Sequence, residues 1–185
     1  MMDSKTEPEI IARVLSGDRQ AYALLVEAYN GPIFNLAYRM TGSREDADDL
    51  TQETFIRAYQ NLRRYDRSKK FFTWLYTIGI NLIRNHLKKN VRDISYLAAA
   101  DSALEHHTQE HTREVGETLS DDRMNRLEQV IRKLPVDLRE AIILKFVQDL
   151  TFEEVAAVTG DSVSAVKMRI YRGLDKIKQM MEDTK

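Results

Sequence analysis

Cysteine is absent from this 185-residue chain, which excludes disulfides and thiolate metal sites and is typical of a reducing cytoplasm. Apolar runs are short, and none approaches the about 20 residues needed to span a bilayer. The polar, acidic N-terminus has no apolar stretch of the kind that directs export. Only three prolines and seven glycines occur, so few residues interrupt helices. These absences predict a cytoplasmic, helix-rich protein that does not insert into a membrane.

The charges that are present divide the chain into three parts. Residues 1–92 carry 15 basic and 11 acidic side chains, residues 93–123 carry 2 and 8, and residues 124–185 carry 11 and 10. Helical apolar spacing fades in the middle part, which is too long for a loop inside a compact domain. We therefore predict a domain at 8–92, a flexible acidic linker at 93–123 and a second domain at 124–185.

Apolar residues recur three and four apart in both predicted domains, and no segment alternates as a strand does. The sequence therefore predicts an all-α protein of two small helical bundles. In the first domain we expect helices near 8–15, 21–29, 33–40, 44–62 and 72–89, separated by breaks that include Asn30-Gly31-Pro32. Ser43 is the predicted N-cap of the 44–62 helix, whose first turn is acidic.

The second domain is predicted to contain a helix-turn-helix. Thr151 and Glu154 have the spacing of a capping box, Gly160 suits the end of that short helix, and Asp161 or Ser162 begins a longer one. Inward-facing stripes are expected on the last two long helices: Leu138, Ala141, Ile142 and Phe146, then Val163, Val166, Ile170, Gly173, Leu174 and Ile177.

The outer face of the last helix is basic and suits duplex DNA. Arginine on a helix in the major groove pairs with guanine, and flanking cations neutralise phosphates. A solvated amphipathic helix would show the same face, but the capping box and turn glycine favour DNA binding. The predicted duplex-binding residues are Ser164, Lys167, Met168, Arg169, Tyr171 and Arg172.

Two contrasting segments follow each other in the first domain. Residues 44–53, REDADDLTQE, carry five acids and one arginine, and such a face either binds a protein or is simply solvated. Residues 62–76 combine cations with Phe71, Phe72, Trp74 and Tyr76, and this combination suits single-stranded DNA, because cations follow phosphates and rings stack on bases. The alternative is that some of these rings, Phe71 or Phe72 among them, belong to the core.

Four segments together resemble sigma factors of the extracytoplasmic-function (ECF) group of bacterial RNA polymerase. They are YRMTGSREDADDLTQETFIRAYQNL (38–62), FFTWLYTIGINLI (71–83), LPVDLREAIILKFVQDLTFEEVAAVTG (134–160) and VKMRIYRGLDKIK (166–178). The resemblance covers nearly the whole chain apart from the linker. It implies a subunit that guides core polymerase to promoters and opens them, with no catalytic residue and no cofactor.

The same resemblance assigns partners to surfaces. The acidic helix would bind the clamp helices of the polymerase β′ subunit through Asp46, Asp48, Asp49, Gln52 and Glu53. The −10 element, melted to single strands, would be bound by Arg63, Arg64, Arg67, Lys69, Lys70, Trp74, Asn81, Arg84 and Lys88. The predicted duplex-binding residues would read the −35 element. The β flap and an anti-sigma factor are further implied partners. Asn85 and Lys88 replace the family's usual Asp and Arg, which leaves promoter preference open.

Three other interpretations compete with this one. An autonomous helix-turn-helix regulator would need only the second domain, and would have no use for a single-strand surface. A hydrolase using the acids at 45–49 lacks an accompanying histidine or nucleophile. His106, His107 and His111 could bind zinc, but their segment shows no stable helical pattern, so we expect no metal site.

Overall fold

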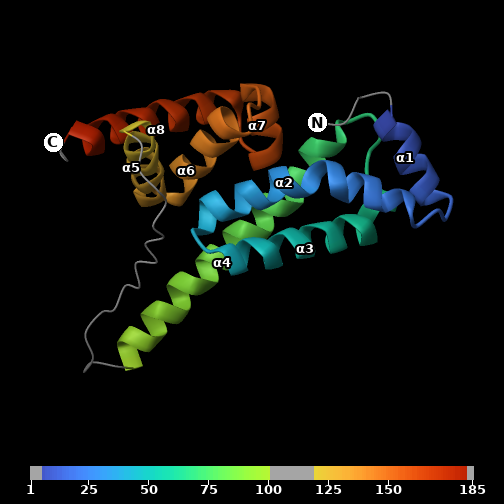
Figure 1. Ribbon diagram of the computed structural model, residues 1–185, viewed down its shortest axis with the longest axis horizontal. Helices are drawn as coiled ribbons and strands as arrows, with labels where there is room; N and C mark the ends of the chain where they lie inside the picture. Colours follow the sequence, from blue (N-terminus) through green and yellow to red (C-terminus); the bar gives the residue numbers. More distant parts are fainter. Residues whose placement is uncertain (1–5, 101–118, 183–185) are drawn as a thin grey trace.

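The computed structural model describes residues 6–100 and 119–182, and the side chains of 6–90 and 124–182. Every regular element in that part of the chain is helical (Figure 1), as the sequence predicts. The first bundle contains α1 (Thr6–Leu15), α2 (Ala21–Thr41), α3 (Arg44–Asn61), the short η1 (Leu62–Arg64) and α4 (Phe71–Ala100). The second contains α5 (Leu119–Lys133), α6 (Val136–Ile142), η2 (Ile143–Val147), α7 (Phe152–Thr159) and α8 (Val163–Glu182). No described helix is both long and apolar enough to cross a membrane.

The helix break predicted at Asn30-Gly31-Pro32 was wrong, because α2 runs through all three residues. Proline inside a helix costs about 3 kcal/mol. The residues on either side offset this cost: Tyr29 and Ile33 are almost completely buried, and burial of a large apolar side chain contributes about 1.5–3 kcal/mol. Packing therefore outweighs a local signal that would end an isolated helix.

The boundaries of α3 and α4 follow from local chemistry. The Asp46 backbone N–H donates to Ser43 Oγ at 3.2 Å, which confirms Ser43 as the N-cap. Helix α4 runs past the predicted end near Lys89 to Ala100, through a segment with three consecutive alanines, the best helix former. The predicted linker includes residues 101–118, which lie outside the described residues, so its flexibility stays a prediction.

The helix-turn-helix of the second bundle has the predicted caps. The Glu154 N–H donates to Thr151 Oγ1, the Thr151 N–H donates back to the Glu154 carboxylate, and Gly160 ends α7 with a positive φ of 76°. Of the two candidate caps for α8, Ser162 takes the role by accepting the Ala165 N–H at 3.2 Å. Asp161 instead pairs with Arg169.

Two residues predicted to face inward are exposed. A π-helical turn at 143–147, closed by the Gln148 N–H on the Ile143 carbonyl, widens the helix and rotates Phe146 outward to 56% exposure. Leu174 is 40% exposed, because it lies about 80° from Val166 around α8. Gly173, near the centre of the stripe, is the residue that meets α6.

The two bundles pack directly against each other. Helix α7 lies along α4, and α5, α6 and η2 contact α2. In Figure 1 the yellow-to-red second bundle accordingly lies along one side of the blue-to-green first bundle. Buried apolar residues of both bundles form one continuous cluster. The face of α4 that was predicted to bind DNA therefore has a protein neighbour.

Candidate nucleic-acid interface

Most of the aromatic residues predicted for the single-strand surface belong to the core. Phe71, Phe72 and Tyr76 are at most 8% exposed and Tyr65 is 9% exposed. Tyr65 and Phe71 pack edge to face with ring centroids 5.5 Å apart. Of the two interpretations of these rings, the core one therefore holds for Phe71, Phe72 and Tyr76. Trp74 alone of that segment's rings is partly exposed, because three- and four-residue spacing turns the others toward the core.

The basic segment before α4 is exposed and anchored. Arg63, Arg64, Arg67 and Lys69 are all exposed. Tyr65 lies among these cations in the sequence, but its ring is buried, and its hydroxyl donates to the Lys69 carbonyl. One buried ring thus fixes a loop whose remaining side chains point to solvent.

The predicted residues of α4 share one face. Trp74, Asn81, Arg84 and Lys88 fall within about 80° around the helix axis at 100° per residue. Asn81 and Lys88 are exposed. The basic loop from Arg63 to Lys70 and this face of α4 are together called the cationic strip, and its members Lys70 and Arg84 form ion pairs with the second bundle.

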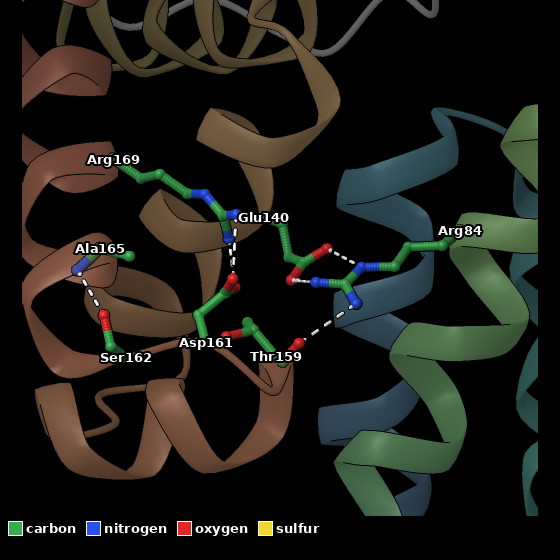
Figure 2. A network of polar contacts seen from close by, with 7 residues as sticks. All are labelled: Arg84, Glu140, Thr159, Asp161, Ser162, Ala165 and Arg169. Atoms are coloured by element: carbon green, nitrogen blue, oxygen red, sulfur yellow. Dashed lines mark hydrogen bonds and ion pairs between the residues drawn. The ribbon is translucent and has the colours of Figure 1, made fainter.

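Arg84 reaches across to α6 (Figure 2) and makes a bidentate ion pair with Glu140. Arg84 Nε donates to Glu140 Oε2 at 2.7 Å and Nη2 donates to Oε1 at 2.6 Å. The third nitrogen, Nη1, donates to the Thr159 carbonyl at 3.4 Å. Every nitrogen of the guanidinium therefore has an acceptor in the second bundle.

Glu140 is only 1% exposed, so its charge depends on its neighbours. Burial raises the pKa of Glu140 above its ordinary value, and the hydrogen bonds and charge of Arg84 oppose that rise without cancelling it. An ionised carboxylate in such a place is tolerated only with a cation beside it. Arg84 is that cation, and it comes from the other bundle.

Further polar contacts join the bundles around this pair. Lys70 Nζ lies 2.6 Å from Glu154 of the capping box, and the Tyr76 hydroxyl donates to Gln148 Oε1 at 2.7 Å. At the end of α2, Arg39 pairs with Glu128 at 2.6 Å. No local pattern indicates these contacts, since each joins residues that are separated by 72 positions or more along the chain.

The outer face of α8 is free of the first bundle. Ser164, Lys167 and Arg172 are exposed, as are Met168 and Tyr171. Arg169 is the exception among the predicted readers, because it is held in a two-point ion pair with Asp161 (Figure 2). Burial raises the pKa of Asp161, but the hydrogen bonds from Arg169 and Thr159 and the charges of Arg169 and Arg84 together outweigh it, so the pKa lies below its ordinary value. This pair braces the start of α8.

The acidic helix α3 presents a mixed surface. Asp48, Asp49 and Gln52 are exposed. Asp46 lies 3.3 Å from His86, and Glu53 pairs with Arg57 one turn on, so these two predicted docking residues already have partners in the chain.

An apolar hollow next to this acidic surface was not predicted. Ile56 and Tyr59 are 51% and 41% exposed and line an open hollow with Tyr22 and Phe55. Large apolar side chains that are exposed together mark an interaction surface. The prediction from the sequence considered only the acids of α3, although Ile56 and Tyr59 lie three residues apart on the same helix and could have indicated this surface.

No cluster of three or more metal-ligating side chains occurs among the described residues. His106, His107 and His111, the weighed zinc ligands, lie outside that part of the chain.

Comparison with known proteins finds a family model that matches each bundle. The family model "Sigma-70 region 2" matches residues 25–93, and "Sigma-70, region 4" matches residues 124–177. The ECF RNA polymerase sigma factor SigW of Bacillus subtilis is 35% identical over 94% of this chain and 95% of its own length. The ECF sigma-E factor of Escherichia coli K12 is 32% identical over 96% and 95%.

A solved structure shows the same arrangement of helices. CnrH in complex with the cytosolic domain of CnrY superimposes with a TM-score of 0.68 at 26% identity, and the match covers 95% of this chain and 97% of CnrH. The sigma factor RpoE of Bartonella quintana, solved with the anti-sigma factor NepR, shares the fold at 20% identity and a TM-score of 0.69.

Proposed function

The chain belongs to the ECF group of RNA polymerase sigma factors, and from that premise we propose which of its surfaces performs each step of initiation. Its function is to recognise promoters and initiate transcription. The single observation that supports the division of labour is that two basic surfaces lie on different bundles: the exposed face of α8, and the strip of the basic loop and α4. One surface suits duplex DNA and the other suits a separated strand.

The upstream −35 element is read by α8. A helix whose exposed face carries Arg172, Tyr171 and Met168 fits the major groove. Lys167, at the edge of that face, is suited to a phosphate. Arg169 contributes indirectly, because its pairing with Asp161 fixes the start of the helix.

The −10 element is captured by the basic loop and α4. Arg63, Arg64, Arg67 and Lys69 follow the phosphates, and Trp74 offers the ring on which a base stacks. Asn81 and Lys88 continue the strip along α4. Opening base pairs sacrifices stacking of about 1.4 kcal/mol per step, so contacts to the captured strand offset part of that cost.

Core polymerase docks on α3. The exposed acids Asp48 and Asp49, with Gln52, face the clamp helices of the β′ subunit, and the neighbouring Ile56 and Tyr59 supply apolar contact area. The second bundle meets the β flap. Since CnrH and RpoE of Bartonella quintana were each solved with a partner, an anti-sigma factor in the second case, we propose an anti-sigma partner here as well. The protein acts in the cytoplasm, without a cofactor and without catalysing a reaction itself.

Transcription in vitro with purified core polymerase tests this function. The free chain is expected to bind promoter duplex weakly, because each basic surface is small, yet to direct core polymerase to start at a promoter. Gel-shift titration of the free chain and run-off transcription with core measure the two properties. Tight sequence-specific binding by the free chain with no effect on polymerase would instead identify an autonomous regulator.

Arg172→Ala is expected to weaken discrimination for the upstream element by about 1–3 kcal/mol, the value of a bidentate arginine–guanine contact. Lys167→Ala is its matched control on the same helix. It should weaken specific and random duplex alike and flatten the salt dependence, because phosphate contacts carry no sequence information. Holoenzyme binding to specific and scrambled duplexes over a salt series separates the two. Equal losses on both duplexes for Arg172→Ala would remove it as a reader.

A further inference from the structure

The ring of Phe152 brings together two lysines from different elements of the second bundle. Lys145 of η2 and Lys167 of α8 each place Nζ 5.4 Å from the centroid of this ring. An ammonium within about 6 Å of an aromatic centroid is attracted by the negative face of the ring. Phe152 is the first residue of α7 and packs against the core, and α7 contacts both η2 and α8. One anchored ring therefore sets the positions of two charges.

Lys145 is also fixed by a hydrogen bond. Its Nζ donates to the Leu150 carbonyl at 2.9 Å, and the Leu150 N–H donates to the Leu144 carbonyl at 3.1 Å, within the turn that leads into α7. An ammonium carries three N–H donors, and the contact with Leu150 uses one of them. Lys145 can therefore hold this turn and still donate to an oxygen from outside the chain.

Neither lysine has a carboxylate partner in the described part of the chain. Lys70, Arg84 and Arg169 each pair with a carboxylate, whereas no ion pair between described residues includes Lys145 or Lys167. Two cations held at one ring repel each other, and an anion beside them relieves that repulsion. The cluster therefore has the charge to bind an anion, and the exposure of Lys167 makes it accessible.

The position of the cluster indicates which anion it binds. Lys167 lies at the edge of the reading face of α8, between Ser164 and Tyr171. Under the proposed function that face enters the major groove of a duplex, and the phosphate backbones border the groove. Contacts to phosphates fix the register and orientation of a protein on the duplex. A backbone phosphate of duplex DNA is therefore the anion that this cluster meets.

We propose that Phe152 is a positioning residue for the upstream promoter contact, and that its ring holds Lys145 and Lys167 as a two-lysine clamp on the phosphate backbone. This inference rests on the proposed function of α8 and deepens it, because it adds Lys145, which lies outside the reading helix, to the duplex contacts. The advantage is entropic. A lysine side chain loses much rotamer freedom when it is immobilised, so a side chain that the ring already holds loses less on binding.

Full-length variants assembled with core polymerase test the role of the ring. Phe152→Leu removes the ring but keeps an apolar side chain and every charge. Fluorescence anisotropy over a salt series measures binding to a duplex that carries the upstream element of a promoter used by the holoenzyme, and to a scrambled duplex. Phe152→Leu should weaken binding to both about fivefold, because two contacts between the ring and cations are lost. Phe152→Tyr, which keeps a ring, should restore the parental affinity.

A double-mutant cycle separates positioning from folding. Lys145→Met and Lys167→Met remove the charge but keep an unbranched side chain, and each should reduce the slope of log K against log salt by about 0.9. In the variant that carries both, Phe152→Leu should weaken binding less than twofold. The matched control is Lys178→Met, at an exposed position farther along α8, in which Phe152→Leu should still cost about fivefold.

Lys145→Met also removes the hydrogen bond to the Leu150 carbonyl, so the cycle is repeated with Lys167→Met alone. Lys167 is exposed, and its replacement leaves the turn before α7 intact. In this background the effect of Phe152→Leu should fall to about twofold, because one of the two ring contacts has already been lost.

Three outcomes would overturn the inference. A fivefold loss that persists in the variant lacking both lysines would mean that Phe152 acts only through the fold. No loss on replacing the ring in the parent would remove it from the contact. A loss confined to the promoter duplex would place the ring in base reading, because phosphate contacts carry no sequence information.

The same measurements keep this inference separate from the proposed function. If Lys167→Met weakens binding to both duplexes and Phe152→Leu weakens neither, only the positioning role is wrong. If Lys167→Met leaves both affinities unchanged, the phosphate contact proposed for Lys167 is wrong as well. A parent protein that never directs polymerase in run-off transcription rejects the function itself.

Discussion

Reversing Asp48 and Asp49 together to Lys is expected to weaken binding to core polymerase at least tenfold, equivalent to about 1.4 kcal/mol. Both carboxylates are exposed on α3, beside the apolar hollow that contains Ile56 and Tyr59. Complementary charge speeds encounter and excludes wrong partners, and like charge across an interface is costly. Competition for core against the labelled parent protein measures the loss.

The control for this variant is Glu9→Lys with Glu27→Lys. It makes the same change in net charge at two exposed positions of the same bundle, away from the proposed docking surface. Circular dichroism should show both variants folded, because none of the four side chains is buried. If the Asp48, Asp49 variant competes for core as well as the control does, α3 is not the docking helix.

Replacing Gly173 with Val is expected to destabilise the second bundle by about 1–3 kcal/mol or more, the usual cost of overpacking a core. A Cβ at this position would lie 2.9 Å from Ile142 Cγ1 and 3.1 Å from its Cδ1. Valine would add two further methyl groups, forcing α6 and α8 apart and displacing the reading face. Thermal unfolding should show a lower Tm by about 4 °C or more for a domain of this size, together with loss of −35-dependent initiation.

Lys176→Val separates packing from helix propensity. It places the same β-branched side chain at an exposed position of the same helix, where only the small propensity cost of valine, under about 0.7 kcal/mol, applies. Similar Tm values for the two variants would mean that α6 and α8 are not in close contact at Gly173.

Features that depend only on residues nearby in the sequence could be predicted. Ser43, Thr151 with Glu154, and Gly160 all act as the caps that their local spacing indicates, because a cap bonds to backbone groups within four residues. The exposed acids of α3 and the outer face of α8 were predictable for the same reason: helical periodicity determines which side chains share a face.

Where the prediction failed, packing against residues far away in the sequence determined the structure. Pro32 lies inside a helix because Tyr29 and Ile33 are buried against other helices, and no local rule includes that energy. The sequence left open whether Phe71, Phe72 and Tyr76 are core or a stacking surface, since composition shows that rings and cations are adjacent but not which way each ring faces, and packing places all three in the core. Phe146 points outward because a π-helical turn shifts the register.

The sequence by itself determined the helical fold, the helix-turn-helix, the positions of the acidic and basic faces and the resemblance to sigma factors, because all of these are encoded in spacing of three to seven residues or in continuous motifs. Only the tertiary structure decided that Arg84 meets Glu140 and that Lys70 meets Glu154. The reason is physical: an ion pair between residues 56 or 84 positions apart forms only when whole bundles dock, and the free energy of docking comes from surfaces that no local pattern describes.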